Sequence, residues 1–94
     1  MAFFAVIYRY RPDEDTLDEH RPAHRAFLRS LYHAGKLVVS GPLGGDADPA
    51  ALLVFDSDSA DEVAALLDKD PFRDHGLIAE REIRPWTIAT GSLR

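Results

Sequence analysis

The chain has 94 residues, 46% hydrophobic and 29% charged, with no cysteine and a formal net charge of −5. This composition indicates one globular domain over residues 1–94 and excludes disulfides and thiolate metal sites. The acidic balance without a basic run argues against nucleic acid and membrane surfaces as partners. The lack of cysteines, of a signal peptide and of an apolar span favours a cytoplasmic protein.

The first predicted element is a strand at residues 3–10, which are rich in aromatic and β-branched side chains and contain no glycine or proline. Apolar residues occur at both alternating sets of positions along this run. That pattern is typical of a strand covered on both of its faces. A polar connection with several acidic residues follows.

The first helix follows this connection, and two starting points are open. Thr16 and Glu19 have the spacing of a capping box, which would start the helix early and place Pro22 in its interior. An interior proline clashes with the preceding turn, whereas proline is well tolerated in a first turn. We therefore expect a turn at 16–20, with Pro22 in the first turn and Gly35 as the left-handed cap at the end.

Two short strands are expected next. The first covers residues 37–40 and is closed by Gly41-Pro42, and the second covers residues 50–55, which are again apolar at both sets of positions. A Gly- and Asp-rich turn at 44–49 separates them. The short link predicts an antiparallel hairpin.

The second helix is predicted to begin at a capping box formed by Ser59 and Glu62 and to stop before Pro71. An irregular segment is expected at 72–76. A last strand is then expected over 77–90, interrupted near its proline.

The resulting order β-α-β-β-α-β predicts an α+β ferredoxin-like sandwich. Its antiparallel sheet would have the strand order 4-1-3-2, with both helices on one face. The opposite face needs another cover, because the first and third strands are apolar on both sides and no element of the chain is left to supply one. We therefore expect a homodimer whose sheets pack face to face.

A histidine interrupts the apolar stripe of the first helix. His24 is followed at helical spacing by Phe27, Leu28 and Leu31, so its side chain is expected on the buried face, where a polar group needs a partner. On the second helix, Asp70 continues the apolar stripe in the same way. The two helices are antiparallel in this topology, so the start of one lies near the end of the other. The pattern predicts that His24 meets Asp70.

Such a pair has two interpretations. A carboxylate that accepts a hydrogen bond from one imidazole nitrogen orients the ring and stabilises its protonated form, which is the arrangement of a general acid/base. A buried His–Asp pair also occurs as a structural contact between helices. No Gly-x-Ser-x-Gly motif supports a hydrolase triad.

Further candidates surround this pair. Ser40, Gly41 and Pro42 could shape a substrate pocket, and aromatic residues could line it; the same positions also suit turn and core residues. The aromatic candidates are Tyr8, Phe72 and Trp86. His20 and His24 are four residues apart, which is a metal-ligand spacing, but no HExxH motif accompanies them, so we expect no metal and no cofactor.

Five segments, in order and spacing, resemble the YCII-related (YciI-like) domain family. They are Arg21-Pro22-Ala23-His24-Arg25-Ala26-Phe27-Leu28, Ala34-Gly35-Lys36-Leu37, Ser40-Gly41-Pro42-Leu43, Asp70-Pro71-Phe72 and Ile83-Arg84-Pro85-Trp86. The resemblance implies a dimeric α+β barrel, close to muconolactone isomerases and small cofactor-free monooxygenases. It also implies a His–Asp active site, which falls on His24 and Asp70.

One branch of that family is similar to a dehydrochlorinase of chlorinated hydroquinones. The resemblance thus favours a cofactor-free enzyme of the lyase or isomerase type, which moves protons on a small cyclic or aromatic molecule. His24 would be the acid or base, and Asp70 would orient it. The alternative is a dimeric module that binds a small molecule without turning it over.

Overall fold

The computed structural model describes residues 2–45 and 47–93, so the predicted turn at 44–49 and the 1–94 boundaries include residues outside the described part. The described elements, in chain order, are β1 (Phe3–Tyr10), α1 (Glu14–His33), β2 (Leu37–Leu43), β3 (Ala50–Asp56), α2 (Ala60–Leu67), α3 (Pro71–Asp74) and β4 (Ile78–Trp86).

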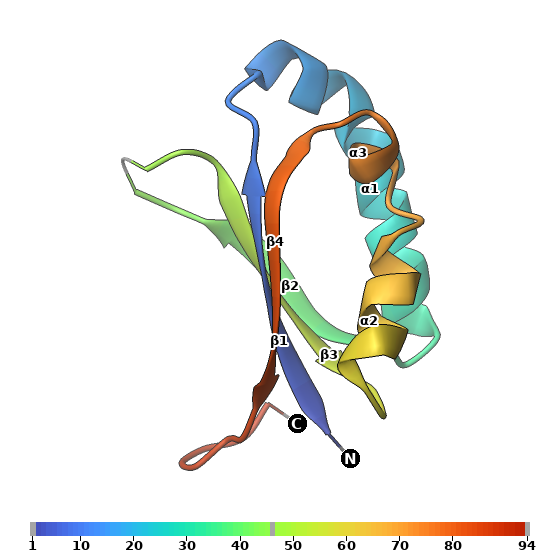
Figure 1. Cartoon of the computed structure of the whole chain (residues 1–94), viewed down its shortest axis with the longest axis vertical. Coiled ribbons are helices and arrows are strands. Elements are labelled where there is room, and N and C mark those ends of the chain that lie inside the picture. Colours follow the sequence, from blue (N-terminus) through green and yellow to red (C-terminus); the bar gives the residue numbers. More distant parts are fainter. Residues whose placement is uncertain (1, 46, 94) are drawn as a thin grey trace.

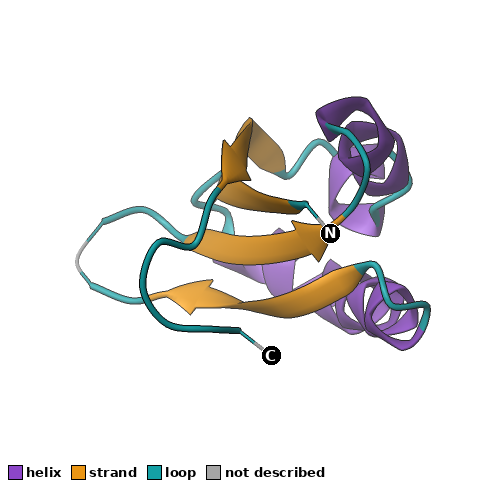
Figure 2. Cartoon of the chain, turned by 90° about the horizontal axis from the view of Figure 1, so that it is seen from below, coloured by secondary structure: helices purple, strands orange, loops and turns teal. Residues whose placement is uncertain are grey.

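The strands form one antiparallel sheet in the order β2-β3-β1-β4. This is the predicted order, read from the other edge. The helices all lie on one face of the sheet, with α1 and α2 running along it and α3 next to α1 (Figure 1). From below, strands and helices form two separate layers (Figure 2). The ferredoxin-like α+β fold is therefore confirmed.

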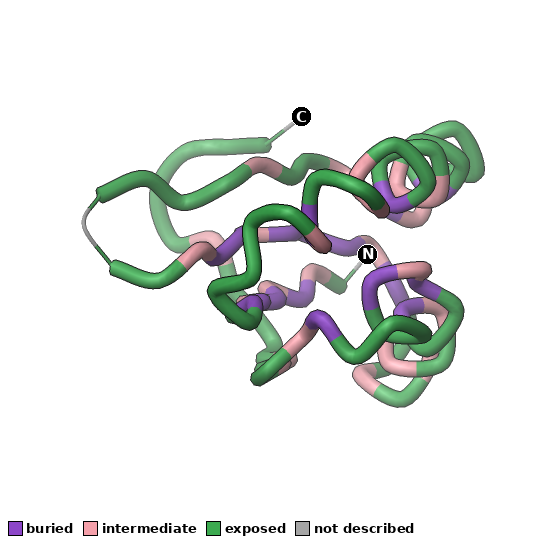
Figure 3. Tube along the Cα trace, turned by 90° about the horizontal axis from the view of Figure 1, so that it is seen from above, coloured by how far each residue is buried: buried purple, intermediate pink, exposed green. Residues whose placement is uncertain are grey.

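The core lies between the sheet and the helices. On β1, every second side chain from Phe4 to Tyr10 is buried against the helical layer, as are Leu53 and Phe55 of β3. The buried stretches follow the central strands and the inner sides of the helices, whereas residues 44–45 and 47–48, between β2 and β3, are exposed (Figure 3).

The other face of the sheet carries many apolar side chains that none of the described elements covers. The strand register places Ile7 of β1 opposite Leu52 of β3, and Val39 of β2 beside Val54. Three large apolar residues are most exposed there, namely Val39, Leu43 and Trp86, at 47%, 45% and 39%. An apolar sheet face of this kind is typical of a surface that packs against another molecule.

Helix α1 begins at Glu14, so the predicted turn at 16–20 is wrong. Asp13 is the N-cap: its carboxylate accepts the Thr16 N–H at 3.3 Å and the Thr16 hydroxyl at 2.8 Å. Pro22 lies inside the helix. The axis of α1 bends after its first turns (Figure 1), which is how helices accommodate an interior proline.

The end of α1 matches its prediction. Gly35 has φ +79°, its N–H donates to the Tyr32 carbonyl, and the Lys36 N–H donates to the Leu31 carbonyl, each at 3.0 Å. This pair of hydrogen bonds is a Schellman motif, and it requires a left-handed residue where Gly35 stands.

Strand β2 continues through Gly41-Pro42 to Leu43, so the prediction that this dipeptide closes the strand is wrong. Similarly, β4 passes through Pro85 and ends at Trp86, so the predicted extension to residue 90 is also wrong. Both strands lie at the edges of the sheet. An edge strand has a neighbour on one side only, so a proline, which lacks an N–H, is tolerated there.

The start of α2 is confirmed, because the Ser59 hydroxyl accepts the Glu62 N–H at 3.1 Å. The helix ends at Leu67, three residues before Asp70. Asp70 is instead the N-cap of α3, a short helix in the segment predicted to be irregular. The prediction that Asp70 continues the apolar stripe of the second helix is therefore wrong.

Candidate active site

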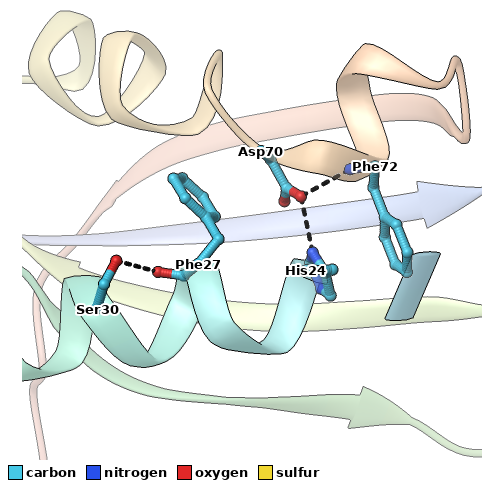
Figure 4. A network of polar contacts seen from close by, with 5 residues as sticks. All are labelled: His24, Phe27, Ser30, Asp70 and Phe72. Carbon is cyan, nitrogen blue, oxygen red and sulfur yellow. Dashed lines mark hydrogen bonds and ion pairs between the residues drawn. The ribbon is translucent and has the colours of Figure 1, made fainter. Parts of the chain in front are cut away.

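The structure brings His24 and Asp70 into direct contact. Nδ1 of His24, on α1, lies 2.8 Å from Oδ1 of Asp70, and the two side chains point toward each other between α1 and α3 (Figure 4). His24 is 6% exposed and Asp70 is fully buried. A carboxylate oxygen at this distance accepts a hydrogen bond from Nδ1–H, which leaves Nε2 as the nitrogen free to exchange protons.

The local fold fixes the Asp70 carboxylate. As the N-cap of α3, it accepts the Phe72 N–H at 2.9 Å, through the same Oδ1 that faces His24. The next residue is Pro71, which suits the first position of a helix. The Asp-Pro-Phe sequence therefore forms the helix start and orients the partner of His24 in one step.

Aromatic rings fix the plane of the imidazole. The Phe72 ring stacks on His24 with 3.9 Å between centroids and 6° between planes. Tyr10 meets His24 edge-on at 6.3 Å and meets Phe72 edge-on at 5.4 Å. Rotation of the imidazole would break the stack as well as the hydrogen bond, so the ring is held in one orientation.

The second oxygen of Asp70 faces a different environment. Oδ2 and the Tyr8 hydroxyl are both buried, and neither makes a hydrogen bond of good geometry to a described residue. Burial, and then the charge of Asp70, raise the pKa of Tyr8. Burial, and then the same charge, also raise the pKa of Tyr10. Both phenols are therefore neutral over the physiological range.

A pocket of about 220 Å³ opens beside His24. Its lining residues come from β1, α1, β2 and β3, and they are Tyr10, Arg21, His24, Arg25, Leu28, Ser40, Gly41, Pro42, Ala51 and Leu53. Ser40, Gly41 and Pro42, named from the sequence, thus lie in one wall. The lining is mainly apolar with a few polar groups, which is typical of a small-molecule site.

The other predicted residues are placed differently. Phe72 is the stacking partner of His24 and is not among the residues that line the pocket, and Tyr8 is buried in the core. Trp86 pairs in register with Phe3 on the uncovered face of the sheet, so the prediction that Trp86 forms a wall of this pocket is wrong for a single chain. The β-strand alternation of β4 sends its side chain away from the helices.

Sequence reasoning missed Tyr10, Arg21 and Arg25 as pocket residues. Tyr10 shares a strand face with Tyr8, and the two arginines flank His24 on α1. The available signal was helical spacing, because Arg21 and Arg25 are four residues apart on the helix that carries His24.

The remaining histidines do not join the site. His20 lies on α1 and stacks on His75 at the end of α3, with 3.6 Å between ring centroids. Within residues 2–45 and 47–93, no group of three or more histidine, aspartate or glutamate side chains could hold a metal ion. In the same part of the chain, no helix is long and apolar enough to cross a bilayer.

The fold and the site define a ferredoxin-like domain with a buried His–Asp contact beside a pocket. The chain belongs to the YCII-related domain family, whose model matches residues 2–87. A comparison with curated proteins gives no match.

Solved structures resemble the chain over almost its full length. One is 5-chloro-2-hydroxyhydroquinone dehydrochlorinase from Burkholderia phenoliruptrix, in complex with 2,5-dihydroxybenzoquinone. It has 27% identity and a TM-score of 0.78, with 90% of this chain and 93% of that chain covered. A cofactor-independent oxygenase from Streptomyces nogalater has 15% identity, coverage of 96% and 94%, and a TM-score of 0.56.

A third structure, a dimeric ferredoxin-like protein from an uncultured marine organism, has 15% identity, complete coverage of both chains and a TM-score of 0.59. At these identities, the oxygenase and the dimeric protein support the fold alone.

Proposed function

We propose that this protein is a cofactor-independent enzyme that uses His24 as a general acid/base, oriented by Asp70, on a small cyclic or aromatic molecule. The observation that carries the proposal is the buried 2.8 Å contact between His24 and Asp70 at the wall of a pocket. A purely structural contact needs no adjoining pocket, and an imidazole that lines one is accessible to a ligand.

The chemistry follows from the positions of the protons. While Nδ1–H donates a hydrogen bond to Asp70, Nε2 accepts a proton from the substrate, and the buried carboxylate stabilises the imidazolium that results. In an elimination, the electron pair of the broken bond to hydrogen expels a leaving group as an anion. The net change is loss of one molecule of acid, such as hydrogen halide, without an oxidant or reductant. In an isomerisation, His24 returns the proton to another carbon.

The size of the pocket supports a single substituted ring. A cavity of about 150 Å³ in another protein holds benzene, and the pocket beside His24 measures about 220 Å³. The similarity to a dehydrochlorinase of a hydroxylated aromatic ring, at 27% identity, favours elimination over isomerisation.

We also propose that the functional unit is a homodimer formed through the uncovered sheet face. The apolar residues Ile7, Leu52 and Val39 lie on that face, and a second copy of the same face would bury them. Two-fold symmetric pairing of one face with its own copy is the commonest arrangement of soluble oligomers.

The experiment measures halide release from a panel of chlorinated hydroquinones and catechols, together with proton exchange at the ring carbons in D₂O by NMR. The variants are His24→Gln, Asp70→Asn and, as matched control, His33→Gln, since His33 is an exposed histidine of the same helix. We expect loss of activity by about 10²–10⁴-fold in His24→Gln, a smaller loss in Asp70→Asn, and none in the control.

Two results would contradict the proposal. Full turnover by His24→Gln would remove His24 from the chemistry. Tight binding of a ring compound, with neither halide release nor proton exchange in the wild type, would instead identify a module that binds a small molecule without turning it over.

A further inference from the structure

Arginines line the surface beside His24, although the chain as a whole is acidic. A groove of about 400 Å³ lies between α1 and β2 and shares Arg25, Leu28 and Ser40 with the His24 pocket. Its other lining residues are Arg29, Tyr32, Leu37, Val38 and Val39. The chain has 16 acidic and 11 basic residues, yet no aspartate or glutamate of the described residues lines the pocket or the groove.

The arginines of this region lie in one row along α1. Arg21, Arg25 and Arg29 follow one another at intervals of four residues, so all three lie on one side of the helix. Arg21 and Arg25 line the His24 pocket, and Arg25 and Arg29 line the groove. Arg25 therefore lies at the junction of the His24 pocket and the groove.

Among the described residues, two arginines of this row have no carboxylate partner. In the described part of the chain, most arginines form an ion pair with an aspartate or glutamate; these are Arg9, Arg21, Arg73, Arg81 and Arg84. Arg25 and Arg29 form none there. In an acidic chain, a guanidinium at the junction of two apolar hollows remains available for an anion from outside.

We infer that the site selects a ring compound bearing a carboxylate, with Arg25 as the residue that binds this group. The inference rests on the proposed function, whose substrate class it narrows. A planar guanidinium donates two parallel hydrogen bonds to a carboxylate, which fixes both the position and the orientation of the ligand. The ring then lies between Leu28 and His24, and Arg29 adds a second positive charge farther along the groove.

The test compares two probes that differ mainly in charge, 2,5-dihydroxybenzoate and its neutral amide, 2,5-dihydroxybenzamide. Binding to the wild type is measured by isothermal titration calorimetry at low salt. We expect the carboxylate to bind about tenfold or more tightly than the amide, as hydrogen bonds between charged groups allow. Arg25→Gln should remove this preference, and Arg29→Gln should reduce it.

Arg73→Gln is the matched control, because it removes the same charge from a residue that lines neither the His24 pocket nor the groove. Thermal unfolding checks that each variant is folded. Equal affinity of the wild type for the two probes would overturn the inference. So would a preference that survives Arg25→Gln, or no binding of either probe at millimolar concentration.

His24→Gln separates this inference from the proposed function. If the preference for the carboxylate persists in His24→Gln and in a wild type that turns nothing over, the anion site stands and the catalytic proposal fails. If the wild type releases halide equally well from neutral and carboxylated rings, the catalytic proposal stands and the anion site fails.

Discussion

The contact between His24 and Asp70 joins two elements that are far apart in the sequence. Oδ1 of Asp70 accepts from Nδ1 of His24 at 2.8 Å and from the Phe72 N–H at 2.9 Å. One buried oxygen atom therefore both starts α3 and holds it against α1. The site and the packing of α3 depend on the same carboxylate.

Replacing Asp70 should therefore affect stability to a degree that depends on the new side chain. In Asp70→Ala, loss of the N-cap costs about 0.5–2 kcal/mol, and leaving the His24 nitrogen without a partner costs about 1–3 kcal/mol. Asp70→Asn keeps an oxygen acceptor, so it should lower the free energy of unfolding by at most about half as much as Asp70→Ala. Urea unfolding followed by circular dichroism measures both.

The control for this comparison is Asp13, the N-cap of α1, whose side chain is exposed. Asp13→Ala loses only a cap, so its cost should stay near 1 kcal/mol. If Asp70→Ala costs no more than Asp13→Ala, Asp70 does not hold α3 against α1.

The start of α1 was not predictable from the local sequence pattern. Pro22 favoured a late helix start, since an interior proline costs about 3 kcal/mol. The earlier start adds the Asp13 cap, worth about 1 kcal/mol, and fully buries Leu17, worth about 1.5–3 kcal/mol. These gains offset the cost of the proline, and the second of them depends on tertiary packing that local pattern does not reveal.

The candidate site, like α1, was predictable only in part. The apolar stripe that includes His24, combined with the topology, was enough to predict Asp70 as the neighbour of His24. It did not reveal that Asp70 reaches His24 as a helix cap. Trp86 was assigned to the pocket without a strand register, and register decides which face of the sheet a side chain occupies. Arg25 lies outside the apolar stripe, and its helical spacing from Arg21 does not by itself show that it lines a pocket, so the structure was needed to place it there.

Alkaline pH should unfold the protein through Tyr8 and Tyr10. Burial raises the pKa of both phenols above the ordinary value of 10.0. Above pH 10 the unfolded state therefore loses protons that the folded state keeps, and the free energy of unfolding falls as the pH rises. This contribution is fully present below pH 10 and is lost as the pH rises through the folded-state pKa values.

Absorbance of phenolate at alkaline pH, followed together with circular dichroism, checks this. The ionisation of Tyr8 and Tyr10 should coincide with loss of secondary structure. Tyr8→Phe should weaken the dependence of stability on pH above 10. Phenolate formation by both residues in a protein that remains folded would show that they are not protected by burial.

The end of α1 offers a test of backbone conformation alone. Gly35 has φ +79°, and a Cβ added there would meet no atom within 4 Å. Gly35→Ala should thus cost roughly 1–2 kcal/mol, entirely from the left-handed backbone. Gly44→Ala is the control, because Gly44 also has open space but no positive φ. If the two substitutions have equal effects in urea unfolding, the left-handed cap does not limit residue choice at this position.

The uncovered sheet face should control the oligomeric state. Leu52 lies in β3, near the middle of that face and opposite Ile7, so Leu52→Lys places a charge where two apolar faces would meet. Sedimentation velocity at micromolar concentration should show a dimer for the wild type and a folded monomer for Leu52→Lys. Tyr32→Lys puts the same charge on a residue of α1 that is 57% exposed and should remain dimeric. A wild type that sediments as a folded monomer would instead mean that this face stays open to solvent, and that the His24 pocket is complete within one chain.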